Sequence, residues 1–375
     1  MWPAVVMCCG KKVKTPEKLC AAEPGQRVVQ GTEQRIFYKE RLKKEKMNPR
    51  FSAILGALTA DAATLGLHWL YDAERLKNLQ QQGPLVFLAP DLKNYQGVMG
   101  YFAHSGKRAG DLSFYGESCR LMLAHLAKTG GNFDRQAFQQ EWLAAFGPGG
   151  HWVGYADHPT RQTVMRLLSY TKPEDYPAIS GADDDQLPAL ECIPAIVASQ
   201  RAGQGRSRDD LICTVQQAVA VTHDHPQARD AATVAAIALD EVLTGTPLPQ
   251  ALSQAAQAAG DVLRPLLIEA LALPTLDAPA AAARFGMPCH LHQGLPLLFH
   301  IAHRANSFSE AVEANILAGG DSCGRSLMLG ALTAAHDALR LQKEASPVLG
   351  IPLSWLSQLA GIADIVKQAE RITAE

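Results

Sequence analysis

Apolar residues follow a helical period directly after residue 50. The stripe consists of Phe51, Ile54, Leu55, Leu58, Ala62 and Leu65. A repeat of about 3.6 residues is typical of one face of a buried helix. Asp61 lies on the same stripe, between Leu58 and Leu65, so the helix would turn its carboxylate toward the core. Burying a charge is costly, which makes Asp61 a candidate catalytic residue. The alternative is a structural carboxylate that binds the terminus of a neighbouring helix.

Helical patterns recur along the rest of the chain. A helix is expected from about Glu117 to the glycine pair at 130–131, and Ser207 to Asp210 has the spacing of a capping box before another. Further helices are predicted over 228–243, 295–305, 310–317 and 326–341. Since no series of alternating apolar and polar residues indicates strands, we predict an all-α fold. Its architecture would be a single compact multi-helix bundle over residues 48–375.

Residues 1–46 differ from this pattern. They contain 11 Lys/Arg and 5 Asp/Glu and no sustained hydrophobic period. The apolar run Ala4–Met7 is too short for the core of a secretory signal. We therefore expect a disordered or mis-assigned extension, with translation starting at Met47.

Composition and charge exclude several classes of protein. The chain is 47% hydrophobic but only 6% aromatic, and its frequent alanines favour helices that pack closely. No basic cluster follows residue 50, so nucleic acid is not an expected partner. No apolar stretch is long enough for a membrane span, and none of the eight cysteines forms a C-x-x-C pair. A cytoplasmic protein fits best, and the oligomeric state stays open.

The most distinctive polar segment is the turn Gly319-Gly-Asp-Ser-Cys-Gly-Arg325. It opens a helix, where backbone N–H groups favour phosphate or a metal–carboxylate cluster. Asp321 is suited either to cap this helix or to bind a hard cation. Arg325 is suited to bidentate phosphate binding or a structural ion pair. Cys323 is either a nucleophile activated by the helix terminus or a small buried hydrophobe.

Three segments together resemble the ADP-ribosylglycohydrolase family. They are Gly56-Ala-Leu-Thr-Ala-Asp61 in the first helix, Thr222-His223-Asp224-His225-Pro226, and Asn315 to Ser322 at the glycine turn. Residues 67–72 and 154–163 look more like the divergent branch that includes the J-type lens crystallins. The resemblance implies hydrolysis of a glycosidic bond to ADP-ribose or a related ribosyl compound. The expected partner is a small-molecule or ADP-ribosylated substrate.

The same resemblance implies a centre with one or two Mg²⁺ ions. The family's Thr-Asp-Asp-Thr motif is best matched by residues 115–118, which retain Glu117 and Ser118. In its Gly-Gly-Asp-x-Asp-Thr motif, Cys323 and Gly324 replace the final Asp and Thr. The expected catalytic residues are Asp321, Glu117 and Asp61. The expected metal ligands are Asp321, Glu117, Ser118 and Asp111.

Substrate contacts are expected from the glycine turn and from the segments that contain His68 and His223. The residues concerned are Gly319, Gly320, Ser322, Arg325, His68, Trp69 and His223. Trp69 beside His68 suits nucleoside stacking, or alternatively belongs to the core. The run Asp183-Asp184-Asp185 is interpreted as a solvated acidic loop. Because the metal motifs are altered, a second hypothesis is a member without this hydrolysis that binds a nucleotide-like ligand or serves structurally.

Overall fold

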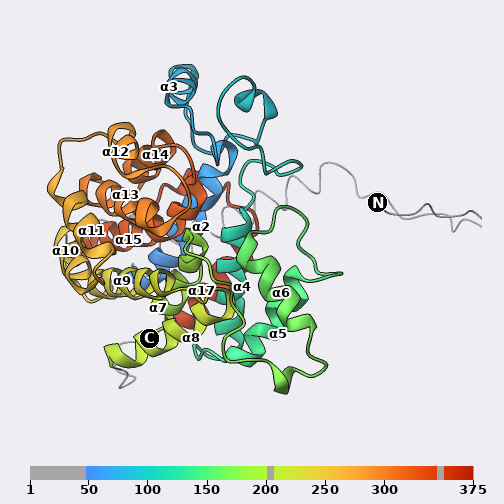
Figure 1. Cartoon of the computed structure of the whole chain (residues 1–375). Coiled ribbons are helices and arrows are strands. Elements are labelled where there is room, and N and C mark those ends of the chain that lie inside the picture. Colours follow the sequence, from blue (N-terminus) through green and yellow to red (C-terminus); the bar gives the residue numbers. More distant parts are fainter. Residues whose placement is uncertain (1–47, 201–206, 344–349, 375) are drawn as a thin grey trace, which may run out of the picture. The chain divides into compact units, whose positions relative to one another are not determined.

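The computed structural model describes residues 48–200, 207–343 and 350–374, and these form the all-helical arrangement in Figure 1. The described residues contain isolated β-bridges but no strand, which confirms the predicted fold class. The prediction for residues 1–46 falls outside the described residues. The α-helices are α2 (Pro49–Thr64), α3 (Ala73–Gln82), α4 (Phe114–Lys128), α5 (Arg135–Phe146), α6 (His158–Leu168), α7 (Ile193–Ser199), α8 (Arg208–Thr222), α9 (Pro226–Leu243), α10 (Leu248–Ala258), α11 (Leu263–Ala272), α12 (Ala278–Phe285), α13 (Leu291–Arg304), α14 (Phe308–Leu317), α15 (Ser322–Lys343), α16 (Leu353–Leu356) and α17 (Ile362–Thr373). Short 3₁₀ turns lie at Leu65–Leu67, Leu92–Tyr95, Pro173–Asp175 and Leu187–Leu190.

Capping side chains decide where several helices begin. Ser207 and Asp210 form the predicted capping box at the start of α8. The helix expected from about Glu117 instead starts at Phe114, because Ser113 accepts a hydrogen bond from the backbone N–H of Gly116. Similarly, α15 starts four residues earlier than expected. The apolar period identifies a helix only after its first turn, whereas the cap fixes its first residue.

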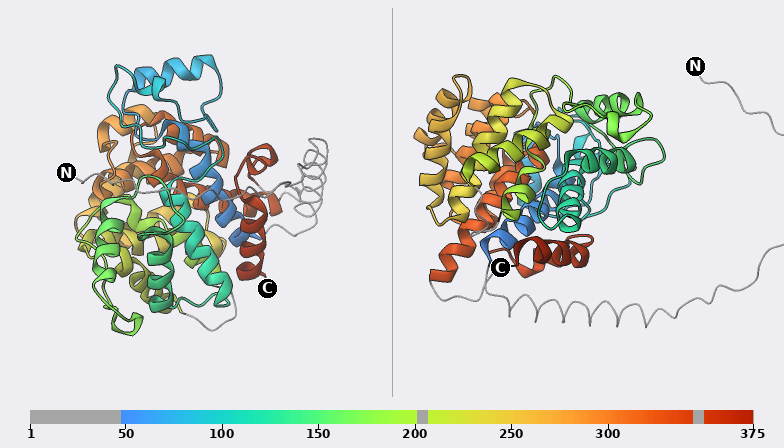
Figure 2. Two further views of the ribbon diagram at one scale, coloured as in Figure 1. Left: turned by 90° about the vertical axis from the view of Figure 1, so that its right-hand side faces the viewer. Right: turned by 90° about the horizontal axis from the view of Figure 1, so that it is seen from below.

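Two helices distant in sequence, α2 and α15, pack against each other along their length, and Figure 2 shows the blue α2 beside the orange α15. Their backbones nearly touch at Gly56 and Gly330. A Cβ on Gly56 would lie 2.4 Å from the carbonyl oxygen of Gly330, and a Cβ on Gly330 would lie 2.4 Å from that of Gly56. Small residues therefore permit the close packing that the composition predicted. This contact places the end of α2 beside the start of α15.

No helix in the described ranges has both the length and the hydropathy required to cross a lipid bilayer.

Candidate functional site

The glycine turn before α15 is held by backbone hydrogen bonds to two other segments. The N–H of Trp69 donates to Gly320 O at 2.8 Å, and the N–H of Gly320 donates to Leu70 O at 2.8 Å. The N–H of Asp321 donates to Met287 O at 3.0 Å. Gly320 has φ +64°, and a Cβ there would lie 2.3 Å from Met287 O. Gly320, which together with Gly319 was expected to contact substrate, thus makes room for the protein's own backbone.

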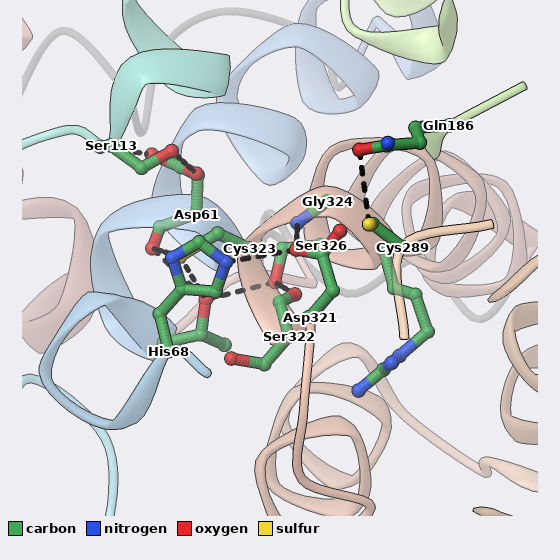
Figure 3. Close-up of polar contacts among 12 residues, drawn as sticks. Asp61, His68, Ser113, Gln186, Cys289, Asp321, Ser322, Cys323, Gly324 and Ser326 are labelled. Atoms are coloured by element: carbon green, nitrogen blue, oxygen red, sulfur yellow. Dashed lines mark hydrogen bonds and ion pairs between the residues drawn. The ribbon is translucent and has the colours of Figure 1, made fainter. Parts of the chain in front are cut away.

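Asp321 lies at the centre of the site and is fully buried (Figure 3). Its Oδ1 accepts a hydrogen bond from the N–H of Gly324 at 2.9 Å, so the residue caps α15. The same oxygen lies 2.9 Å from Nε2 of His68. Oδ2 is buried and has no hydrogen-bond partner. The carboxylate is therefore held firmly by one oxygen while the other remains available.

His68 links Asp321 to a second histidine that the sequence analysis did not single out. Nδ1 of His68 lies 2.7 Å from Nε2 of His104, and both rings are buried. Since a carboxylate only accepts, His68 donates from Nε2 and accepts at Nδ1 from His104. Burial lowers the pKa of His104 to about 2, which keeps its ring neutral. The result is a hydrogen-bonded chain from His104 through His68 to Asp321.

The side chain of Arg325, for which a phosphate contact was expected, points into the protein. Its side chain is fully buried, and its Nε donates to Oδ1 of Asn315 at 2.7 Å. One terminal nitrogen donates to Gly319 O. Burial lowers the pKa of the guanidinium to about 10, so the group stays charged at neutral pH. Arg325 therefore stabilises the glycine turn from inside.

The two residues between Asp321 and Gly324 are also buried. The thiol of Cys323 lies 3.5 Å from Oγ1 of Thr64, and burial raises its pKa well above the usual value. Without a metal this group stays protonated, which contradicts the hypothesis of an activated nucleophile. Ser322 is 1% exposed, and its hydroxyl has no hydrogen-bond partner. Its placement leaves no surface contact for a substrate.

Asp61 has the inward orientation predicted from the stripe on α2, but it contacts α4. Its Oδ2 accepts a hydrogen bond from the N–H of Ser113 at 2.8 Å, and Oδ1 accepts from the hydroxyl of Ser113. Burial raises the pKa of the carboxyl to about 7, although the Ser113 hydrogen bonds oppose this rise. This arrangement matches the alternative interpretation, a carboxylate bound to a neighbouring helix terminus.

The remaining expected metal ligands do not join Asp321. Glu117 accepts a hydrogen bond from Nε of Arg120 at 2.7 Å and lines a surface hollow together with Asp111. Asp111 itself accepts from the N–H of Arg108. Ser118 is buried on α4, beside Glu191. The contacts described for Glu117, Asp111 and Ser118 are thus with groups other than Asp321.

Helix geometry explains why the ring of Tyr115, rather than the carboxylate of Glu117, lies beside His68. Tyr115 and Glu117 are two residues apart, which is about 200° around a helix. Tyr115 is buried, and its ring meets that of His68 edge-on with centroids 5.7 Å apart. The Asp321 charge and burial both raise the pKa of the phenol. The start of α4 therefore presents Tyr115 to the centre and Glu117 to the surface.

Trp69 belongs to the same packed group. It is 8% exposed and adopts a positive φ of 61°. Its ring lies 4.3 Å from His68 and 4.9 Å from Tyr155, measured between centroids. The ring is therefore part of the core, which was the alternative to nucleoside stacking.

A second polar cluster lies around Asp184, which is buried, whereas Asp183 is exposed as expected of a solvated loop. Asp184 is 7% exposed and accepts a hydrogen bond from Nδ1 of His158 at 3.0 Å. Nε2 of His223 is buried without a hydrogen-bond partner, 4.0 Å from Oδ1 of Asp184. Burial lowers the pKa of His223 to about 3. Asp157 caps α6 nearby, and burial raises its pKa to about 6.

Tyr115 lies near both clusters: burial is the main reason that the pKa of its phenol is raised, and the charges of Asp321 and Asp157 add to the rise. Sequence reasoning identified His223 but missed Asp157, Asp184 and His104. The one sequence pattern that could have drawn attention to this cluster was Asp157 to Thr160, which has the spacing of a helix N-cap. A cap is normally exposed, so this signal did not indicate burial.

Comparisons with known proteins identify the family to which this chain belongs. The family model described as ADP-ribosylglycohydrolase matches residues 47–375. The chain belongs to the ADP-ribosylglycohydrolase family. Crystallin J1A from Tripedalia cystophora is 25% identical over 336 residues, which cover 86% of this chain and 95% of the crystallin. Both findings confirm the resemblance stated from the sequence motifs.

A solved structure supports the fold. The structure described as "ADP-ribosylglycohydrolase-related protein complex" superposes with a TM-score of 0.62 at 18% sequence identity. The match covers 88% of this chain and 98% of that one. The ADP-ribosylglycohydrolase fold is thus retained over nearly all of the described helices.

The residues at the turn do not fit the pair of Mg²⁺ ions that membership in the ADP-ribosylglycohydrolase family implies. Mg²⁺ requires near-octahedral oxygen coordination, whereas the groups around Asp321 are imidazoles, a thiol and aromatic rings. Gly324 adds no oxygen, and a Cβ there would lie 2.5 Å from Oδ2 of Asp321. Among the expected carboxylate ligands, Asp321 alone lies at the turn, so no catalytic step is assigned to Mg²⁺.

Proposed function

We propose that this protein hydrolyses a glycosidic bond to ADP-ribose or a related ribosyl compound, with Asp321 as the central catalytic residue. Family membership supports the reaction class. The buried Oδ2 of Asp321, which has no partner, carries the residue assignment. An unsatisfied buried oxygen costs about 1–3 kcal/mol or more, so a functional reason for its retention is expected.

Asp321 is fully buried, but two of its neighbours are only half-buried. Tyr71 and Cys289 are half-buried, and the charge of Asp321 acts on both their phenol and thiol groups. Figure 3 shows Cys289 and Gln186 across from the start of α15, joined by a hydrogen bond of 3.0 Å. A small movement of these side chains would open a path to Oδ2.

In the proposed reaction, water adds to the anomeric carbon as the glycosidic bond breaks. Oδ2 of Asp321 takes a proton from this water, and the leaving group takes a proton from solvent. The hydrogen bonds from His68 and Gly324 to Oδ1 hold the carboxylate in place. His68 and His104 act as positioning residues in this scheme.

The test compares the full chain with its Asp321→Asn variant on a panel of N- and O-linked ADP-ribosyl compounds. Released ADP-ribose is measured by chromatography. We expect the variant to lose at least about 100-fold in kcat, the usual contribution of a general base. Asp277→Asn is the matched control, because Asp277 also caps a helix, α12. Unchanged turnover in the Asp321 variant would refute the assignment.

A second function is favoured by the relative Crystallin J1A and by the missing metal carboxylates. In this alternative the protein keeps the fold but binds a nucleotide-like ligand or serves structurally. Calorimetric titration with ADP-ribose distinguishes the two. Saturable binding without turnover of any compound in the panel supports the alternative, and turnover excludes it.

A further inference from the structure

Three potential metal ligands from separate parts of the chain meet beside Asp321. Nδ1 or Nε2 of His68 and His104 and Sγ of Cys323 all lie within 4.8 Å of one another. The residues follow α2, lie in the loop before α4, and begin α15, respectively. All three are at least nine-tenths buried, with exposures of 1%, 5% and 0%. Two imidazoles and a thiolate are a typical donor set for Zn²⁺ and a poor one for Mg²⁺.

We propose that His68, His104 and Cys323 bind one Zn²⁺ ion. His68 would use Nδ1, His104 would use Nε2, and Cys323 would bind as the thiolate. Three protein ligands leave a fourth position for water, as in catalytic zinc sites. The proposal concerns metal binding alone, and it holds whether or not the protein hydrolyses ADP-ribosyl compounds.

The orientation of His68 supports the proposal independently of the three-residue cluster. A histidine that binds zinc through one nitrogen usually donates from the other to a carboxylate, which fixes the ring and its tautomer. Nε2 of His68 has this partner already, because Oδ1 of Asp321 lies 2.9 Å away. Nδ1 is therefore the nitrogen that carries the lone pair, and it lies 2.7 Å from Nε2 of His104.

The rearrangement required of the two histidines is small. Nδ1 of His68 and Nε2 of His104 are 2.7 Å apart. Two nitrogens that bind one zinc at about 2.1 Å in a tetrahedron lie about 3.4 Å apart, so the rings must separate by less than about 1 Å. The proton on Nε2 of His104 moves to Nδ1, so both rings stay neutral. His104 lies in a loop rather than in a helix, which allows this shift.

Two anionic groups lie close to the proposed ion, while the buried guanidinium of Arg325 has its own partners at the glycine turn. Zn²⁺ brings two positive charges, and the Cys323 thiolate and the Asp321 carboxylate each supply one negative charge. The hydroxyl of Thr64 lies 3.5 Å from Sγ and donates its hydrogen bond to Asp61 O at 3.1 Å. A site of this kind avoids the cost of an unpaired charge in the core.

The experiment measures metal binding by the full chain with Cys8, Cys9 and Cys20 replaced by Ser, so that these three thiols do not contribute. Protein stripped with a chelator is titrated with Zn²⁺ against a chromogenic competitor. Co²⁺ then replaces Zn²⁺, because a thiolate ligand produces a near-ultraviolet charge-transfer band. We expect one ion per chain and a clear band.

Cys323→Ser and His104→Gln are each expected to weaken Zn²⁺ binding at least tenfold, and Cys323→Ser should abolish the cobalt band. Cys289→Ser and Cys213→Ser are controls with half-buried and exposed thiols, and both should bind normally. Circular dichroism checks the fold; if Cys323→Ser does not fold, the loop variant His104→Gln carries the test. Absence of a saturable site, or normal binding by both site variants, would overturn the proposal.

Discussion

Replacing Asp61 by Asn should make the protein less sensitive to rising pH. The folded state raises the pKa of Asp61 from 3.8 to about 7, mainly through burial. The folded protein therefore prefers the protonated carboxyl, so the stabilisation is complete below about pH 4. It is lost as the pH rises toward 7, where the buried group ionises. Asn cannot ionise and should retain this stability.

The magnitude follows from the change in proton affinity. A tenfold change corresponds to about 1.4 kcal/mol, and the roughly thousandfold change at Asp61 corresponds to about 4 kcal/mol. Asn also reproduces the hydrogen bonds of the protonated acid. Its oxygen accepts from the N–H of Ser113 and its amide donates to the Ser113 hydroxyl. The free energy of unfolding should thus be equal in the two proteins near pH 4, and higher in the variant by up to about 4 kcal/mol at pH 8.

The assay is urea unfolding of both proteins at several values between pH 4 and pH 8, followed by circular dichroism. Leu58→Ala provides the control, since it removes buried apolar atoms from the same helix without changing a charge. Its loss of about 2–5 kcal/mol should not vary with pH. A constant difference between Asp61→Asn and the parent protein across this range would refute the reasoning.

Two further predictions concern packing around the site. Gly330→Ala should lower the free energy of unfolding by about 1–3 kcal/mol, because the new Cβ meets the backbone of Gly56. Thermal unfolding should therefore show a lower Tm. A raised Tm would contradict the close contact between the two helices. Arg325→Met should cost about 3–5 kcal/mol, because Asn315 and Gly319 O lose their buried charged donor. Urea unfolding measures that loss, and an unchanged midpoint would show that the turn does not depend on Arg325.

The features that depend on residues within one or two helical turns could be predicted from the sequence. The apolar stripe on α2 predicted both the helix and the inward side of Asp61, because residues three and four apart share a helix face. The capping box at Ser207 was likewise visible, since both partners lie within one turn. The first-helix segment with Asp61, residues 222–226 and the glycine turn together sufficed to recognise the family that the comparisons confirmed.

Only the tertiary structure decided which side chains meet. Asp321 joins His68 across 253 residues, and His68 joins His104 from a loop with no periodic pattern. Arg325 faces inward and Glu117 outward because each side chain follows the direction set by its own helix and the packing around it. Periodicity specifies which face of a helix is buried, but the contacts of a polar atom depend on segments that the chain brings together only on folding.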